Sequence, residues 1–297
     1  MKRGVKGRVT KGMKMCFWNV ARLISKDKEV WEYLKTFNVI GLTETWIEED
    51  NWEKLKYRLP KEFDWKCRAT MRLRKKGRAK GGVITGINKE LREIEYKEIS
   101  DNIVERKIVY NDNTHRVTVV YNQDTKGTWK EIEERVDGRE EEVMIIGGDW
   151  NARTGEKGGP INEDLGKEKN RRSKDKTINT KGRTLLKYLE ERGWMIINGK
   201  DKEGEEWTYI RERGNSVIDY VIGSQETTEE IIGMKVGKRT ESNHVSLKIE
   251  IGGRNYKKLK KRKKKRRRKG KWTNESVEKY LEECKDWICK GRTVEEM

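Results

Sequence analysis

One short stretch constrains the fold of this chain more than any other. Residues 143–147 form a strongly apolar run, and Gly148, Asp149, Trp150 and Asn151 follow it directly. A run of this length that ends in glycine and polar residues is typical of a buried β-strand. The sequence therefore predicts a strand whose carboxyl end carries a carboxylate and a carboxamide.

Similar short runs recur along the first 251 residues. Further strands are predicted at residues 13–20, 39–43, 63–70, 82–87, 104–110, 116–121, 194–198, 207–211, 218–223 and 244–251. Helices are predicted at residues 26–36, 129–142 and 180–192, and a hairpin turn at residues 111–113. Many strands with few helices between them indicate an α/β fold of two packed sheets, each covered by helices on its outer face.

Charge and periodicity divide the chain into four segments. These are a basic N-terminal extension (1–12), a globular domain (13–252), a basic linker or tail (253–271) and an amphipathic helix that could open a further region (272–297). The terminal helix needs a cover for its apolar face, either a reverse-transcriptase region or another chain. Within the domain, residues 155–177 have few apolar side chains and are expected to be either functional or mobile.

The basic tail accounts for most of the net charge of +19, because residues 254–271 contain fourteen Lys or Arg and no acid. Such a tail favours a polyanionic partner, here DNA, although a solvated linker or a nuclear-import signal has the same composition. No run of about 18 apolar residues predicts a membrane span, and the N-terminus lacks a secretory signal. We therefore expect an intracellular, nuclear protein without a membrane partner.

Cysteine and histidine usage is sparse. The four cysteines match no zinc pattern and no dense disulfide framework, and Cys16 and Cys67 are expected to be buried free thiols. His115, one of two histidines, follows the predicted turn and is interpreted as an ordinary surface residue.

Polar residues close several of the predicted strands. They are Asn19, Glu44, Tyr121, Asn122, Asp149 and Asn151, whereas Asn243 and His244 precede the last predicted strand and Asp219 lies within a strand. Each alone would be a turn former or a helix cap, but a carboxylate inside a central strand needs a partner or a metal. Oxygen ligands such as Glu44 would hold a hard cation against a phosphate, and Asp149 would accept a proton from water. The set predicts metal-dependent phosphodiester hydrolysis, with His244 on the phosphate and oriented by Asp219.

Basic and aromatic residues are candidates for nucleic-acid contact. Lys75 and Lys76 lie in a predicted loop that would reach a phosphate backbone, with a solvated hairpin tip as an equally supported alternative. Trp150 adjoins the catalytic strand end and would stack on a base if its ring were exposed, although core packing explains most tryptophans. Arg153, three residues further on, is also assigned to nucleic-acid binding.

Five motifs in this order resemble the endonuclease/exonuclease/phosphatase superfamily, and specifically the apurinic-endonuclease-like domains of LINE-type non-LTR retrotransposons. The motifs are Phe17-Trp18-Asn19-Val20, Leu42-Thr43-Glu44-Thr45-Trp46, Gly148-Asp149-Trp150-Asn151-Ala152-Arg153-Thr154-Gly155, Ser216-Val217-Ile218-Asp219-Tyr220-Val221 and Glu241-Ser242-Asn243-His244. Each is weak alone, but together they cover residues 13–251.

The resemblance implies a four-layered α/β sandwich, with two facing mixed sheets flanked by helices and the site at the top of the sheets. It implies that Glu44 binds Mg²⁺ or Mn²⁺, with Asn19 close by. It further implies an endonuclease that nicks one strand of target DNA, so that the freed 3′-hydroxyl primes reverse transcription.

The resemblance also assigns catalytic roles. Asp149 is expected to activate water with support from Asn151, and Tyr121 is expected to contact the phosphate. Asp219 and His244 match the carboxylate–histidine pair of the superfamily.

One position departs from the pattern. The last motif normally ends in Ser-Asp-His, whereas this chain has Ser242-Asn243-His244. Asn243 keeps an acceptor oxygen beside the metal site but loses the charge, so metal affinity and catalysis are expected to fall. Two alternatives therefore stay open. One is a catalytically inactive nucleic-acid-binding relic, and the other is a phosphatase of the same superfamily that acts on inositol phosphates or lipids.

Overall fold

The computed structural model describes residues 12–70, 80–136, 142–162, 167–168, 170–199 and 206–252. Several sequence predictions lie outside these residues. They concern most of the N-terminal extension, the loop that holds Lys75 and Lys76, the basic tail and the terminal helix.

Six strands form the first sheet: β1 (Met13–Asn19), β2 (Val39–Thr43), β3 (Phe63–Arg68), β4 (Val83–Asn88), β15 (Ile231–Val236) and β16 (Leu247–Ile251). Their order across the sheet is β15-β16-β1-β2-β4-β3. β1 and β2 run parallel, and every other neighbouring pair is antiparallel. The sheet is therefore mixed, and its one parallel pair lies at the centre.

The second sheet also has six strands: β5 (Arg92–Ser100), β6 (Ile103–Tyr110), β7 (Asn113–Tyr121), β8 (Val143–Asp149), β11 (Met195–Ile196) and β14 (Asp219–Gly223). Their order is β11-β14-β8-β7-β6-β5, and again only the central pair, β7 and β8, is parallel. Two short hairpins complete the strands: β9 (Ile161–Asn162) with β10 (Lys167–Glu168), and β12 (Tyr209–Arg211) with β13 (Gly214–Ser216).

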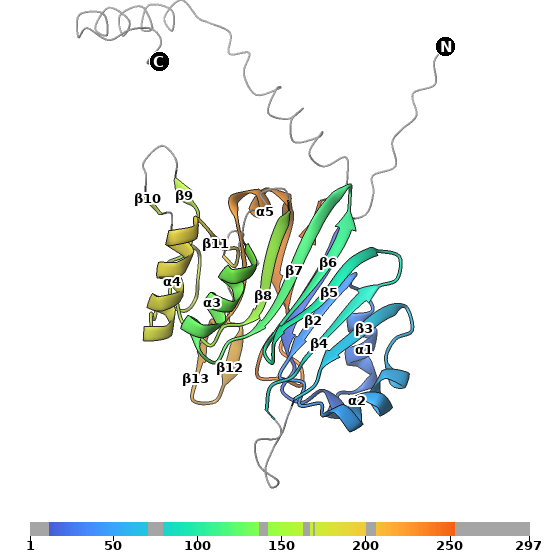
Figure 1. Cartoon of the computed structure of the whole chain (residues 1–297). Helices are drawn as coiled ribbons and strands as arrows, with labels where there is room; N and C mark the ends of the chain where they lie inside the picture. The colour runs from blue at the N-terminus through green and yellow to red at the C-terminus, as the bar shows by residue number, and fades with distance from the viewer. Residues whose placement is uncertain are drawn as a thin grey trace, which may run out of the picture. The chain divides into compact units, whose positions relative to one another are not determined.

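Helices cover the outer faces of the two sheets (Figure 1). They are α1 (Lys28–Leu34), α2 (Glu49–Leu55), α3 (Thr125–Val136) and α4 (Thr180–Arg192). A fifth helix, α5 (Gln225–Glu230), contacts β8 and β14 of the second sheet and β15 of the first, and 3₁₀ turns lie at η1 (Leu23–Ser25) and η2 (Lys56–Arg58). Figure 1 shows α1 and α2 beside the first sheet and α3 and α4 beside the second. This arrangement confirms the predicted four-layered α/β sandwich of two mixed sheets flanked by helices.

Three apolar clusters hold the four layers together. Side chains of both sheets, such as Phe17 and Val119, meet between the sheets. Leu34 of α1 packs on the outer face of the first sheet, and Leu185 of α4 on that of the second. Burial of this apolar area is the main force that presses the layers together.

Two glycines let the strand β8 reach the site. A Cβ at Gly147 would overlap the ring of Phe17, which crosses from the facing sheet. Gly148 has a φ of +144°, and a Cβ there would overlap the carbonyl oxygen of Val120. A side chain at either position would push the sheets or strands apart, so glycine is required directly before Asp149.

Several element boundaries differ from the sequence prediction. α3 begins at Thr125 rather than 129, because the Asp124 carboxylate accepts hydrogen bonds from the backbone N–H groups of Lys126 (3.2 Å) and Gly127 (3.1 Å). The sequence prediction lacked β5, β15, α2 and α5 altogether. β5 is an edge strand with mostly charged or half-exposed side chains, so it has little apolar signal.

The polar segment 155–177 is anchored where the structure describes it. The buried guanidinium of Arg171 donates to the carbonyl oxygens of Gly155 (2.9 Å), Lys157 (2.7 Å) and Asn198 (2.9 Å), and it lies over the ring of Tyr220. A buried, fully hydrogen-bonded cation replaces the apolar anchors that the segment lacks. Cys16 is buried and Cys67 is half-buried, and both are free thiols.

Candidate catalytic site

The central strands of both sheets deliver polar side chains to one region. β1 ends at Asn19, and Glu44 directly follows the end of the neighbouring parallel strand β2. In the second sheet, Tyr121 at the end of β7 lies opposite Asp149 at the end of β8. Asp219 opens the antiparallel strand β14 and also pairs with Asp149. The sheet topology therefore gathers five residues that lie far apart in the sequence.

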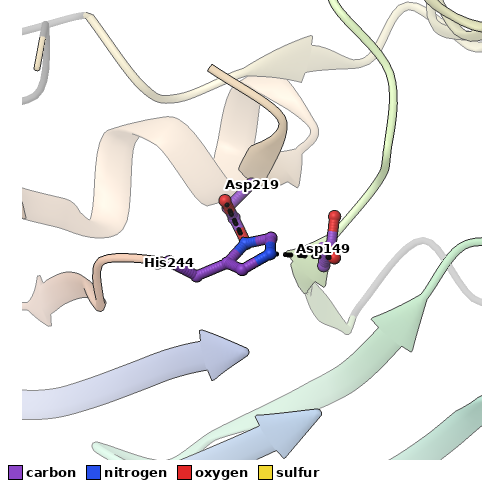
Figure 2. Close-up of side chains that lie close together, drawn as sticks. All are labelled: Asp149, Asp219 and His244. Atoms are coloured by element: carbon purple, nitrogen blue, oxygen red, sulfur yellow. Dashed lines mark hydrogen bonds and ion pairs between the residues drawn. The ribbon is translucent and has the colours of Figure 1, made fainter. Parts of the chain in front are cut away.

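His244 bridges two of these carboxylates (Figure 2). Its Nδ1 lies 3.0 Å from each carboxylate oxygen of Asp219, and its Nε2 lies 3.8 Å from Oδ2 of Asp149. All three side chains are buried, with 7% or less of each residue exposed. The ring of Tyr209 packs edge-on against the imidazole, with 4.7 Å between ring centroids. The imidazole is therefore held on one side and aimed at Asp149 on the other.

Two asparagines orient the carboxylate of Asp149. Asn19 Nδ2 donates to Oδ2 of Asp149 at 2.8 Å, and the backbone N–H of Asn151 donates to Oδ1 at 2.9 Å. The side chain of Asn151 in turn donates to the carbonyl oxygen of Asn122 at 3.0 Å. Both carboxylate oxygens thus have fixed directions, which leaves their remaining lone pairs for a ligand or a water.

Thr208 and Asn198, which lie outside the five motifs, and Ser242 of the last motif fix the other half of the site. Thr208 Oγ1 accepts the backbone N–H of Asp219 (3.1 Å), and Asn198 Nδ2 donates to the carbonyl oxygen of Asp219 (3.0 Å). Ser242 Oγ donates to the carbonyl oxygen of Asn19 (2.8 Å) and accepts the N–H of His244 (3.1 Å). Serine, threonine and asparagine are so common in loops that only the fold reveals these roles.

Burial and charge set the protonation of the central pair. Burial and the neighbouring charge of Asp219 raise the pKa of Asp149 to about 7. Burial alone would lower the pKa of His244, but the charge and hydrogen bond of Asp219, assisted by Asp149, outweigh it and raise that pKa to about 9. Near neutral pH the imidazole is therefore a cation, and Asp149 is poised between its acid and base forms.

A second polar pair stands at the ends of β2 and β7. The phenol of Tyr121 donates to Oε1 of Glu44. Burial, together with the Glu44 carboxylate that accepts this hydrogen bond, raises the pKa of Tyr121 above its ordinary value, so its proton stays in place. Glu44 is only half-buried, so its carboxylate remains open to a further ligand.

Unusual backbone conformations surround the site. Non-glycine residues with a φ in the left-handed region include Ala21 (+44°), Arg22 (+85°), Glu44 (+50°), Trp46 (+56°) and Asn151 (+47°). All five follow the carboxyl ends of β1, β2 or β8. Only asparagine adopts this region readily, so the surrounding fold must hold the others in place. Clustered strain of this kind is characteristic of functional sites.

The donor set is suited to a hard divalent cation. Asp149, Asp219 and His244 offer ligand atoms that lie within 4.8 Å of one another. A protonated imidazole donates through both nitrogens, however, and cannot coordinate a metal. The available ligands are therefore carboxylate and amide oxygens, which Mg²⁺ and Mn²⁺ prefer, and Glu44 and Asn19 add to this set.

Two sequence predictions are wrong. Trp150 is fully buried in the cluster under α3 and α4, next to Trp129, so it cannot stack on a base. His115 is not a surface residue but is fully buried, with its Nε2 at 3.0 Å from Oε2 of Glu230. Its side chain points into the fold because β7 extends three residues further toward its N-terminus than predicted, which makes His115 part of the strand.

Arg153 and Asn243 both have protein partners. The guanidinium of Arg153, which the sequence assigned to nucleic-acid binding, donates to Oδ2 and Oδ1 of Asp175 at 2.8 and 2.7 Å as a bidentate pair. Asn243 is half-buried, and its Oδ1 accepts from Nη2 of Arg239 at 3.2 Å. A ligand that binds either side chain would therefore compete with, or add to, a hydrogen bond within the protein.

Residues 109–248 match the model of a protein family described as endonuclease-reverse transcriptase. No curated protein matches the sequence. Among the residues that the structure describes, no helix is long and apolar enough to cross a membrane.

Solved structures share the fold. The endonuclease domain of TRAS1, a telomere-specific non-LTR retrotransposon, is 18% identical, with a TM-score of 0.57 over 82% of this chain and 99% of that one. The AP endonuclease LMAP from Leishmania major is 10% identical, with a TM-score of 0.63 over 82% and 88% of the two chains. The 3′ phosphatase NExo from Neisseria, bound to product DNA hairpin, is 14% identical, with a TM-score of 0.57 over 80% and 99%. The fold is that of hydrolytic nucleases, and the resemblance inferred from the five motifs is confirmed.

Proposed function

We propose that this chain, whose residues 109–248 carry the sequence pattern of the endonuclease-reverse transcriptase family, is a divalent-metal-dependent endonuclease that nicks DNA. The observation that carries the proposal is the buried carboxylate of Asp149. Asn19 and Asn151 fix its two oxygens, and the imidazole of His244 faces it at 3.8 Å. A base and a cation side by side are what hydrolysis of an anionic ester requires.

The residues divide the work of hydrolysis. Asp149 accepts a proton from water, the water oxygen bonds to phosphorus, and the bond from phosphorus to the 3′-oxygen breaks. The 3′-oxygen takes up a proton from solvent as it leaves, so the products are a 5′-phosphate and a 3′-hydroxyl. His244 donates a hydrogen bond to a phosphate oxygen and offsets its growing charge, while Asp219 keeps the imidazole protonated and aligned. Asp149 is suited to its role because a pKa of about 7 matches a base to neutral solution.

Glu44 and Asn19 are the residues that would hold Mg²⁺ or Mn²⁺. When bound, the ion supplies charge neutralisation and Lewis acidity at the phosphate. Tyr121 donates a hydrogen bond to Glu44 and so fixes one oxygen of this carboxylate. We also assign to this phenol the contact with a bound phosphate that the motif leads us to expect.

DNA is the proposed substrate for three reasons. The motifs resemble the retroelement branch of the superfamily, the TRAS1 domain that shares the fold is a retrotransposon endonuclease, and the basic tail at 253–271 suits a polyanion. In this setting the nicked strand would prime a reverse transcriptase, encoded in a further region or another chain. Action on chromosomal DNA would also require nuclear localisation.

The direct test is nicking of supercoiled plasmid DNA by the full chain in Mg²⁺, with EDTA as control. We expect conversion to the open circle, with a 3′-hydroxyl that a polymerase extends. Binding without nicking at any Mg²⁺ or Mn²⁺ concentration would favour the alternative of an inactive nucleic-acid-binding relic. This alternative rests on Asn243, which stands where the motif normally has aspartate.

Asn243 should weaken the site on its metal side. An amide oxygen carries less negative charge than the carboxylate of the usual motif, so a divalent cation is held less firmly. We predict that Asn243→Asp lowers the Mg²⁺ concentration for half-maximal nicking by about tenfold, within the range that residues around a metal site contribute. The measurement is a Mg²⁺ titration at saturating DNA. An unchanged midpoint would show that Asn243 does not limit metal binding.

A further inference from the structure

The loop between β15 and β16 places an arginine beside Asn243, the position at which this chain differs from the usual motif. Nη2 of Arg239 donates to Oδ1 of Asn243 at 3.2 Å. A guanidinium has donors only, so the carboxamide must turn its oxygen toward Arg239 and its amide nitrogen away from it. The orientation of Asn243 is therefore fixed by chemistry.

Hydrogen bonds hold this loop against the catalytic site at several points. Ser242 donates to the carbonyl oxygen of Asn19, and the carbonyl oxygen of Asn243 accepts the N–H of Ile210 at 2.8 Å. Nζ of Lys26 donates to the carbonyl oxygen of Glu241 at 3.2 Å. His244 directly follows Asn243 in the chain. Arg239 thus projects from a backbone that is positioned rigidly with respect to the catalytic histidine.

Most of the hydrogen-bonding capacity of Arg239 is unused. The side chain is exposed, and Asn243 is its one polar partner among the residues that the structure describes. A guanidinium has five N–H donors in a planar fork, which matches two oxygens of a phosphate. Arg239 is therefore a cation with free donors that is hydrogen-bonded to Asn243, the chain neighbour of His244.

The replacement of aspartate by asparagine has a second electrostatic effect. A carboxylate at position 243 would form an ion pair with Arg239 and neutralise it, whereas the neutral carboxamide orients the guanidinium and leaves its charge available. The same change that weakens the metal side therefore releases a positive charge for the substrate.

We propose that Arg239, oriented by Asn243, binds a phosphate of the DNA strand in the site, so that position 243 supports phosphate binding in place of metal binding. This inference rests on the proposed function in taking DNA as the ligand, but it does not require turnover. It makes Arg239 a binding residue and Asn243 the residue that positions it.

The test measures DNA binding without metal. We would measure the fluorescence anisotropy of a labelled DNA duplex in EDTA at several salt concentrations, with the full-length wild type and full-length variants. All of them carry the basic tail, so its contribution to DNA binding is the same in each. We expect Arg239→Ala to weaken binding about fivefold or more and to reduce the salt slope by about one. Arg239→Lys should lie between them. Arg92→Ala, an exposed arginine at the start of the edge strand β5, should leave both values unchanged.

A double-mutant cycle separates this inference from a simple loss of a metal ligand. Asn243→Asp should weaken metal-free binding by neutralising Arg239, and should have little further effect in the Arg239→Ala background. Equal weakening in both backgrounds, or wild-type binding by Arg239→Ala, would overturn the inference, as would a wild type that binds no DNA. Coupled binding in a chain that never nicks would support the inference and overturn the proposed endonuclease instead.

Discussion

The domain contains two buried histidines, and each is paired with a carboxylate at 3.0 Å. His244 pairs with Asp219 and His115 with Glu230. They differ in what faces the second ring nitrogen. For His244 it is the carboxylate of Asp149, whereas for His115 it is the carbonyl oxygen of Asn113 at 3.2 Å. A buried histidine–carboxylate pair is thus not by itself a sign of catalysis, and the third, ionisable group is what distinguishes the site proposed to be catalytic.

The two pairs also occupy opposite ends of the sheet. His115 lies near the start of β7, six residues and therefore about 20 Å from Tyr121 at its end. Glu230 ends α5 and also accepts from Nδ2 of Asn113 at 2.7 Å, so this pair ties α5 to the hairpin between β6 and β7. The His115–Glu230 pair connects two elements of the fold. The His244–Asp219 pair lies at the strand ends, where neighbouring residues remain open to ligands.

The largest predicted difference between the pairs is in catalysis. Asp219→Asn removes the charge that aligns and protonates His244, so we expect the nicking rate to fall by about 10²–10³-fold. Glu230→Gln, the matched change at the other histidine, should alter the rate less than about twofold. Single-turnover plasmid nicking in Mg²⁺ measures both. If the two variants lose activity equally, the contrast between the pairs fails.

The pH dependence should follow only the catalytic pair. Asp149 must be ionised to act as base, so the rate should rise with pH up to about 7, and His244 must be protonated, so it should fall above about 9. Asp219→Asn should move the alkaline limb to lower pH, because Asp219 holds the proton on His244. His115→Asn should leave both limbs in place. NMR titration of the imidazole of His244 in the metal-free protein checks the assignment independently.

The free energy of unfolding should change in opposite directions when a carboxylate beside each histidine is replaced by its amide. The pKa of Asp149 rises from 3.8 to about 7 on folding, so its ionisation destabilises the metal-free fold, and stability is lost as pH rises from 3.8 to about 7. Asp149→Asn should therefore stabilise the domain at pH 8 in EDTA by on the order of 2 kcal/mol. Glu230→Gln should destabilise it by about 1–3 kcal/mol through loss of a charged hydrogen bond. Thermal unfolding of both variants gives the signs, and two shifts of the same sign would contradict this contrast.

The strand ends were predictable from sequence because local patterns determine them. The apolar run before Asp149 and the helix closed by Gly193, whose φ is +64°, appear in the structure where the sequence placed them. The surroundings of the site were not predictable. Thr208 and Asn198 acquire their roles only when β14 lies beside β8 and β11, and nothing local marks them.

Misjudged side chains have a common physical cause. His115 and Trp150 were interpreted from their neighbours in sequence, whereas their burial depends on which elements pack over them. Asn243 was interpreted from its motif alone, and its partner Arg239 lies four residues away on a loop with no motif. The burial of His115 and Trp150 therefore depends on contacts between distant elements, and the hydrogen bond of Asn243 depends on a loop conformation, none of which a local sequence pattern indicates.

The most direct measurement of the central claim is nicking of supercoiled plasmid by Asp149→Asn beside the wild type in Mg²⁺. The variant keeps the shape of the side chain and, on this account, folds more stably, so lost activity cannot be ascribed to unfolding. We predict a loss of about 10³-fold or more, as expected for removal of a general base. A variant that nicks as fast as the wild type would contradict the assignment of Asp149 and the site built around it.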